Sequence, residues 1–257
     1  AYGYINGCPA YAFSQDSTVS KGAVSRAHSE KICRMFDLAA KNGVPVVGIY
    51  DSCGAFIEDG ADALNAYSEI LLEAGNLSGV VPTVSVVSGV CAGSMAVIAC
   101  AADYVVMTEK AELYAAAGGD AGVKAAVESG AVSASAADDA EAMESVRKYL
   151  SLMPQNNLSP LPEFEFDAPA AASFATAKDS IGAIADDGSV LELRAGFGKA
   201  SVTALCTVGG TTAGIAALDK AAGKLTADDC AKIAGFVRLC DAFSIPVITV
   251  VDTEGFD

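Results

Sequence analysis

The chain has 257 residues, of which 52% are hydrophobic and 19% are charged, and it contains 25 glycines. This composition excludes a disordered protein and is typical of a compact globular one with closely packed backbone segments. Acidic residues outnumber basic ones, 32 to 16, giving a net charge of -16, and no dense cluster of lysine and arginine stands out. Nucleic acid is therefore not expected as a partner.

Three β-branched runs, at residues 44–50, 83–88 and 245–251, are each predicted to be buried strands. They alternate with Gly-containing turns and Ala-rich helical patterns, which indicates an α/β architecture. Residues 74–102 carry no charge and are long enough to span a bilayer. Because one proline, Pro82, and several glycines and serines interrupt this run, we expect a buried strand, turn and helix there in place of a membrane span.

A region rich in proline, residues 153–171, holds four of the eight prolines and few helical signals. It is the natural linker of the chain. The sequence thus predicts an N-terminal lobe at 1–152, a linker at 153–177 and the start of a second lobe at 178–257. The N-terminus lacks a basic start followed by a long apolar stretch, so no signal peptide is predicted. Most of the eight cysteines sit in apolar runs, as expected of buried free thiols in a reducing compartment, so a cytoplasmic location is expected.

The chain repeats itself at an offset of 201 residues. The segment that starts at Lys31 aligns without a gap with the one that starts at Lys232, including identical Pro45/Pro246 and Asp51/Asp252 pairs. An amphipathic helix, a Pro-initiated strand and an Asp-x-x-Gly turn recur in register. Upstream, residues 7–13 resemble 210–216 at an offset of 203. The first copy continues for over a hundred residues beyond its turn, whereas the second reaches only Asp257, so we expect its sheet to be completed by further residues or by another chain.

The segment 85–106 combines a buried strand, a small-residue turn at 89–94 and an Ala/Met helix. Backbone N–H groups at such a turn can stabilise an oxyanion. The glycines could equally serve only close packing of strand and helix. Asp51–Phe56 follows strand 44–50 in the same way, so both turns should meet at one edge of the sheet.

Other polar residues give weaker signals. Cys53 has only His28, the single histidine, to activate it, so a Cys–His dyad is improbable, and His28 is expected to be a solvated helix-start residue. Lys21, Arg26, Lys31 and Arg34 could meet a CoA phosphate or be ordinary solvated helix charges. The eight cysteines form no C-x-x-C pair, so no metal site is predicted.

These motifs resemble the carboxyltransferase β-type subunits of biotin-dependent acyl-CoA carboxylases and decarboxylases. The resemblance runs through the whole chain and is carried by the segments 7–16, 30–32, 51–55, 78–82, 89–93, 186–187, 236–243 and 252–256. It departs from the family pattern at Cys53 and Phe56, where the family has glycine and arginine. It departs again after Tyr114, where the expected Gly-Pro segment is absent and Ala115–Ala117 runs into Gly118.

The resemblance implies a crotonase-like ββα spiral, with one near-complete lobe and the start of a second related lobe. It implies movement of a carboxyl group between biotin on a carrier partner and the α-carbon of an acyl-CoA, without a metal. The predicted oxyanion donors are the backbone N–H groups of Gly93 and Ser94. The predicted substrate-binding residues are Ser52, Cys53, Gly54, Ala55, Cys91, Ala92 and Lys31.

The expected partners are a biotin carboxyl carrier protein or domain, biotin carboxylase or decarboxylase subunits, and further copies of the chain. Two alternatives stay open. One is a non-catalytic CoA-binding or assembly subunit, and the other is an enoyl-CoA hydratase-like enzyme. The hydratase would need acid/base carboxylates in the pocket, for which Glu58 and Asp59 are the nearest candidates in sequence.

Overall fold

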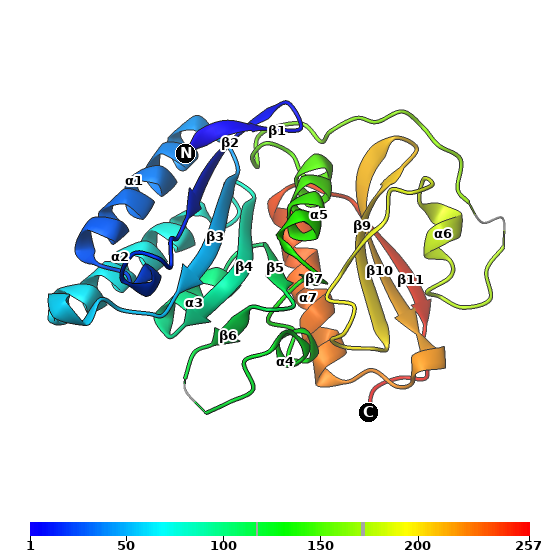
Figure 1. Cartoon of the computed structure of the whole chain (residues 1–257). Coiled ribbons are helices and arrows are strands. Elements are labelled where there is room, and N and C mark those ends of the chain that lie inside the picture. The colour runs from blue at the N-terminus through cyan, green and yellow to red at the C-terminus, as the bar shows by residue number, and fades with distance from the viewer. Residues whose placement is uncertain (117, 171–172) are drawn as a thin grey trace.

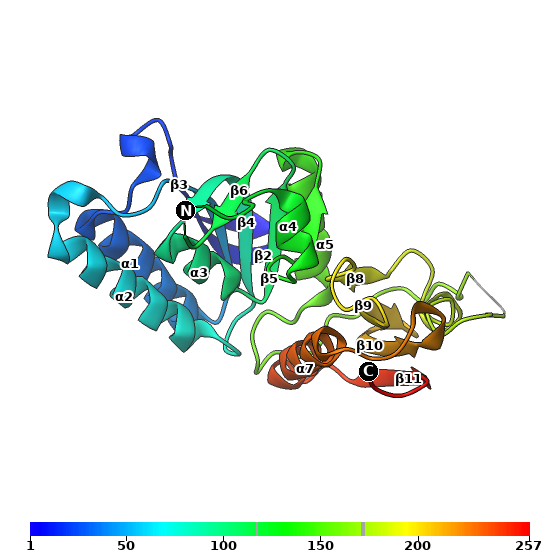
Figure 2. The same ribbon diagram turned by 90° about the horizontal axis from the view of Figure 1, so that it is seen from below.

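The structure is a computed structural model that describes residues 1–116, 118–170 and 173–257. Two sheets lie side by side along the molecule, with helices between and around them (Figures 1 and 2). The predicted strand, turn and helix within 74–102 is confirmed, as β4 (Thr83–Ala92) and α3 (Ser94–Cys100). In the described part of the chain, no helix is both long and apolar enough to cross a membrane.

The first sheet has the strand order β1-β2-β3-β4-β5-β7, and β6 pairs with the far end of β4. Only β1 is antiparallel to its neighbour; the remaining pairs are parallel. Its strands are β1 (Tyr2–Ile5), β2 (Cys8–Ser14), β3 (Val46–Ser52), β4, β5 (Tyr104–Thr108), β6 (Glu112–Tyr114) and β7 (Ala134–Ala136). Strands β3, β4, β5 and β7 each follow a helix, and because they are parallel, their carboxyl ends lie at one edge of the sheet.

Each face of the first sheet is covered by different helices. Alternate residues of β5 show this: Val105 and Met107 pack with α1 (Arg26–Asn42), α2 (Ala61–Leu77) and α3, whereas Tyr104 and Val106 pack with α5 (Asp139–Leu152). The hydrophobic cluster on the face of Tyr104 and Val106 also includes buried Phe236 and Cys240 from α7 (Ala227–Ala242). A strand buried on both faces reads as a continuous apolar run, which explains the uncharged stretch in the sequence.

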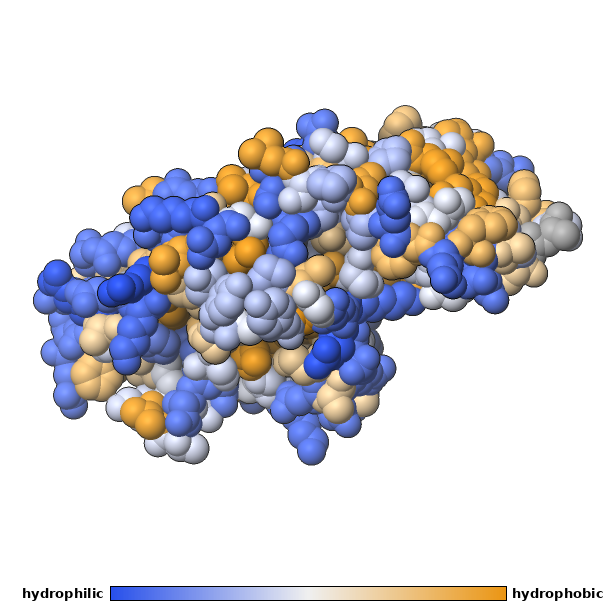
Figure 3. Space-filling model, turned by 90° about the horizontal axis from the view of Figure 1, so that it is seen from above, coloured by the Kyte–Doolittle hydropathy of each residue, from blue (hydrophilic) through white to orange (hydrophobic). Residues whose placement is uncertain are grey.

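The second sheet has the order β11-β10-β9-β8, formed by β8 (Leu191–Leu193), β9 (Ser201–Val208), β10 (Thr211–Asp219) and β11 (Val247–Asp252). Strand β11 stands at the edge of this sheet. Val251 of this strand and Phe256, which follows it, are exposed. Hydrophobic residues gather at this end of the molecule in the space-filling view (Figure 3). The remaining short helices are η1 (Ser20–Gly22), η2 (Ile57–Asp59), α4 (Val123–Glu128), α6 (Ile181–Ile184) and η3 (Lys220–Ala222).

The internal repeat is confirmed residue by residue. Tyr11 of β2 pairs with Val46 of β3, and Gly214 of β10 pairs with Val247 of β11, which reproduces the offsets of 203 and 201. Beyond these strands, the isolated bridge Val24–Ala55 recurs as Leu225–Phe256. The two halves therefore share one backbone hydrogen-bond scheme from the helix start to the turn after the strand.

The segment that links the two sheets contacts strands of both. Gln155 donates its side-chain amide to the carbonyl of Pro9 at 2.8 Å, and the Phe164 N–H donates to Gly210 at 2.8 Å. In the described part of 153–177, the only β pairing is the single bridge Glu163–Thr211. Residues 171 and 172 of the predicted linker, and Ala117 of the departure after Tyr114, lie outside the described residues. The lobe boundaries themselves remain predictions.

Candidate active site

The ends of β3 and β4 bring two turns together at the carboxyl edge of the first sheet. Ser52 and Cys91 are direct partners across the two strands, after a register shift that follows Tyr50. The carbonyl oxygen of Ala92 lies 3.9 Å from the position that a Cβ at Gly54 would occupy. The expectation that both turns meet at one edge is therefore met by the geometry.

Asp51 holds these strand ends in register. Its Oδ1 accepts a hydrogen bond from the N–H of Val90 at 3.1 Å, and its own N–H donates to Oε1 of Gln15 at 3.2 Å. A Cβ at Gly89 would collide with the Asp51 carboxylate, so glycine is required where this carboxylate crosses β4. Sequence reasoning gave Asp51 no role of its own, although the recurring Asp-x-x-Gly pattern was the signal that could have found it.

The turn at 52–56 is built from backbone bonds. Oγ of fully buried Ser52 accepts from the N–H of Gly54 at 3.2 Å, and Gly54 takes a positive φ of 116°. The N–H of Cys53 donates to Lys21 at 3.0 Å, and that of Phe56 donates to Val24 at 3.0 Å. Among the described residues, nothing accepts the N–H of Ala55. Ser52 and Gly54 thus shape the turn, and the N–H of Ala55 is its free donor.

The turn into α3 requires a correction. Gly93 has φ 65° and ψ -137°, and its N–H donates to the carbonyl of Tyr114 at 2.9 Å, extending the β4–β6 pairing. The predicted donor role of Gly93 is therefore wrong in this arrangement, because its N–H is already bonded. Ser94 is the first residue of α3, and no described residue accepts its N–H. Such N–H groups at a helix start are available to a ligand.

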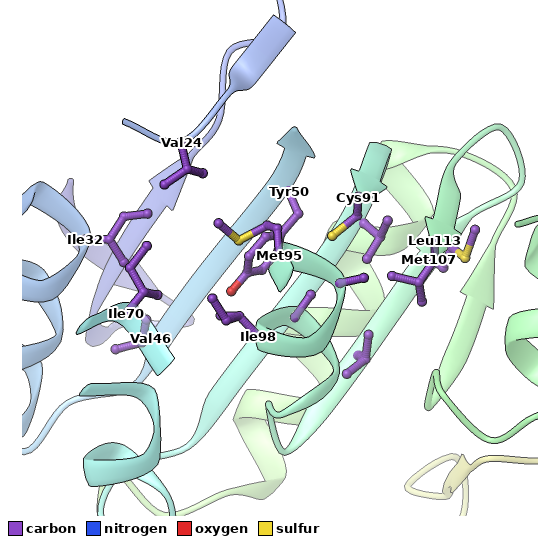
Figure 4. Packing of buried hydrophobic residues seen from close by; sticks show 14 of the residues in the cluster. Val24, Ile32, Val46, Tyr50, Ile70, Cys91, Met95, Ile98, Met107 and Leu113 are labelled. Atoms are coloured by element: carbon purple, nitrogen blue, oxygen red, sulfur yellow. The ribbon is translucent and has the colours of Figure 1, made fainter. Parts of the chain in front are cut away.

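The residues beneath the turns form a fully buried floor. Met95 and Ile98 of α3 point toward Tyr50 and the strands below (Figure 4), and Met95 and Cys91 have no exposed surface. Burial raises the pKa of the Cys91 thiol to about 12, so this cysteine is a neutral packing residue. Of the residues predicted to bind substrate, Cys91 and Ala92 are therefore buried behind the turn, whereas Cys53 and Ala55 are exposed.

Lys31 lines a pocket of about 330 Å³ at the start of α1. Gln15, His28 and Phe56 also line it. His28 is half-buried, which corrects the expectation of a solvated residue, and burial together with the nearby Lys31 lowers its pKa. Lys31 itself is exposed and so is available to an anionic group.

Two further features bear on the chemistry. In the described ranges, no group of three or more histidine, cysteine and acidic residues is placed to hold a metal ion. Asp59, a candidate acid or base for a hydratase, accepts a hydrogen bond from the N–H of Arg26 at 2.9 Å through its Oδ2. That carboxylate therefore caps the start of α1.

The chain belongs to the carboxyl transferase domain family, whose model matches residues 1–127 and 117–257. It is 36% identical to the propionyl-CoA carboxylase beta chain of Roseobacter denitrificans over 99% of this chain and 56% of the relative. It is 34% identical to the methylmalonyl-CoA decarboxylase subunit alpha of Propionigenium modestum, with the same coverage. The chain therefore spans about half the length of the curated relatives it matches.

Among solved structures, transcarboxylase 12S, determined with methylmalonyl-coenzyme A and methylmalonic acid bound, matches with a TM-score of 0.94 at 31% identity. The match covers 100% of this chain and 56% of the transcarboxylase chain. A single-chain, multi-domain long-chain acyl-CoA carboxylase matches 97% of this chain with a TM-score of 0.82. The expected crotonase-like α/β fold is thereby confirmed.

Proposed function

We propose that this chain supplies the first half of a carboxyltransferase that moves a carboxyl group between biotin and an acyl-CoA. The observation that carries the proposal is the pair of unbonded backbone N–H groups, of Ala55 and Ser94, on two turns joined through Ser52 and Cys91. Each donor follows its paired strand residue by three positions. The family membership and the named relatives support the same reaction class.

The chemical task of these donors is to hold a thioester oxygen. When the bond between the α-carbon and the carboxyl carbon of a malonyl-type thioester breaks, its electron pair moves toward the thioester oxygen and forms an enolate. N–H groups fixed by β3, β4 and the buried floor stabilise this negative charge without reorganising. The α-carbon then takes up a proton, and the carboxyl carbon has left without the electron pair. Gly93 serves the site by permitting the turn, not by donating.

Biotin, presented by a carrier protein or domain, would accept or supply the carboxyl group. An oxyanion hole of backbone donors fits its ureido oxygen as well as a thioester. We further propose biotin carboxylase or decarboxylase subunits as partners, further copies of the chain in the assembly, and a cytoplasmic location. The transcarboxylase match, described as a hexamer, supports assembly. Exposed Lys31 and Cys53 are proposed to contact the acyl-CoA.

The two alternatives fare differently. An enoyl-CoA hydratase needs carboxylates that face the thioester. The Asp59 carboxylate instead accepts the N–H of Arg26 at the start of α1, which does not favour this alternative. Glu58 is exposed on η2. A non-catalytic CoA-binding subunit shares the turns and differs only in turnover, so an activity assay separates it from the enzyme.

The experiment follows propionyl-CoA formed from methylmalonyl-CoA by the full polypeptide that contains this chain, with and without free biotin. We expect turnover that depends on biotin. Gly93→Val should abolish it, because valine does not adopt φ 65°, ψ -137°. Gly188→Val is the matched control, since Gly188 has φ 68°, open space around it and a distant position. Binding of CoA without turnover in the unaltered protein would favour the non-catalytic subunit.

A further inference from the structure

A pocket of about 450 Å³ lies at the junction of the two sheets, away from the turns described above. Its walls are the end of α3 with the start of β5, the end of β8, and one face of α7, which stands between the sheets (Figures 1 and 2). The candidate active site lies at the opposite end of α3, about 10 Å away along a seven-residue helix. We call this second site the junction pocket.

Arg194 is fixed at the wall of the junction pocket by its backbone. It follows β8 with a positive φ of 55°, its N–H donates to the carbonyl of Ser133 at 2.8 Å, and its carbonyl accepts from Phe197 at 3.1 Å. Its side chain is half-buried, and burial lowers the pKa of the guanidinium. Within the described residues, no carboxylate lies within 4.0 Å of it. Burial removes water from this guanidinium and no carboxylate replaces it, so the group favours the binding of an anion.

Helix α7 adds charge on the same wall. Lys232, Gly235 and Arg238 recur at three-residue spacing and so share one face of the helix. A Cβ at Gly235 would stand 3.4 Å from Nη1 of Arg194, which places that guanidinium directly over this turn of α7. Lys232 donates to the carbonyls of Phe197, Gly198 and Ser201, which uses all its N–H groups. Arg238 is exposed and, among the described residues, has no carboxylate within 4.0 Å.

The acidic residue of the junction pocket is already engaged. Oδ2 of Asp103 accepts from both the N–H and the hydroxyl of Thr83, at 2.9 and 2.8 Å. It therefore fixes the start of β4 and does not pair with the arginines. In a chain with a net charge of -16, two guanidinium groups without carboxylate partners on one concave surface are a local exception that favours an anion.

We propose that the junction pocket binds a small organic anion, with its phosphate or carboxylate group between Arg194 and Arg238 and its apolar part against Phe236 and Leu239. Guanidinium groups bind both kinds of oxyanion through charge-assisted, paired hydrogen bonds. The volume lies within the range of small-ligand sites, roughly 300–1,000 Å³. The site is independent of the proposed carboxyl transfer.

Isothermal titration of the full polypeptide with inorganic phosphate and, in a separate arm, with succinate tests this proposal and separates the two anion types. We expect at least one of them to bind, with Arg194→Gln and Arg238→Gln each weakening it about tenfold. Arg147→Gln, at an exposed arginine on α5, is the matched control and should leave affinity unchanged. Asp103→Asn should tighten binding two- to threefold by removing a negative charge from the wall.

Arg194→Lys covers the case in which Arg194→Gln fails to fold. It keeps the charge, and because ammonium lacks the paired donor geometry, it should still weaken binding several-fold. Absence of binding by both anions would overturn the proposal. Equal weakening by Arg147→Gln would overturn it too, since the attraction would then be a general effect of charge.

Discussion

The two copies of the internal repeat, residues 25–56 and 226–257, share their backbone scheme but not the use of their side chains. Ser52 and Thr253 each accept the N–H of the glycine two residues later, at 3.2 and 3.1 Å. Yet Lys31 is exposed on α1, whereas Lys232, its exact counterpart in the alignment, is buried under three carbonyls. The repeated unit therefore determines the turn, whereas the surrounding elements determine the contacts of an identical residue.

The surroundings explain this difference. Strand β3 is flanked by β2 and β4, while β11 has β10 on one side and, among the described residues, no strand on the other. Lys232 faces the loop 197–201, which forms the approach to β9. In the first copy β1 pairs with β2 as β9 pairs with β10 in the second, and Lys31 is exposed.

The largest expected effect that separates the copies is on stability. Lys232→Met leaves the carbonyls of Phe197 and Ser201 without this donor, and should lower the free energy of unfolding by about 3 kcal/mol. Lys31→Met, at the matched position, should change it by less than about 0.5 kcal/mol. Urea denaturation followed by circular dichroism measures both. Equal losses would show that the two lysines have the same role.

The glycines of the two turns should behave alike. Gly54 and Gly255 have φ of 116° and 103°, and a Cβ meets at most an ordinary contact at either position. Alanine at each should therefore cost about 2 kcal/mol, through backbone strain alone. The same denaturation assay checks this. A cost confined to Gly54 would mean that packing, and not the repeated backbone, sets the requirement for glycine.

The buried lysine also predicts a pH dependence that Lys31 lacks. Burial lowers the pKa of Lys232 to about 8, below its value near 10.4 in an unfolded chain, so the unfolded state binds more protons between these values. Stability contributed by this group therefore rises with pH from about 8 to about 10, by about 2 kcal/mol. Subtracting the pH profile of Lys232→Met isolates the effect. A difference profile that is flat or falls over this range contradicts the assignment.

The helix caps give a smaller contrast between the two copies than the lysines do. Thr226 and Asp229 form a reciprocal capping box at α7, while Ser25 accepts only the N–H of His28 at α1. Thr226→Ala should cost about 1.5 kcal/mol and Ser25→Ala about 0.7 kcal/mol, because the Thr226 hydroxyl also donates to Oδ2 of Asp229 at 2.7 Å. Thermal denaturation of the two variants ranks them. The reverse order would show that the single cap is the stronger one.

The sequence was sufficient for features that repeat or alternate. The strands at 44–50, 83–88 and 245–251, the offsets of 201 and 203, and the meeting of the two turns all follow from periodicity and turn residues. The N–H of Gly93 was assigned wrongly, because its acceptor is the carbonyl of Tyr114, 21 residues away on a strand too short to predict. The junction pocket was also missed, since it joins Arg194 to Arg238 across two elements that no local pattern connects.

The donor role of Ser94 is the central claim, and one substitution tests it most directly. Ser94→Pro removes the N–H at the first position of α3, where proline is well tolerated, while Ser94→Ala removes the hydroxyl and keeps the N–H. In the methylmalonyl-CoA assay of the full polypeptide, we expect Ser94→Pro to lower kcat by about 10²- to 10³-fold and Ser94→Ala to retain most of it. Full activity in Ser94→Pro, in a protein that remains folded, would contradict the assignment of this backbone donor.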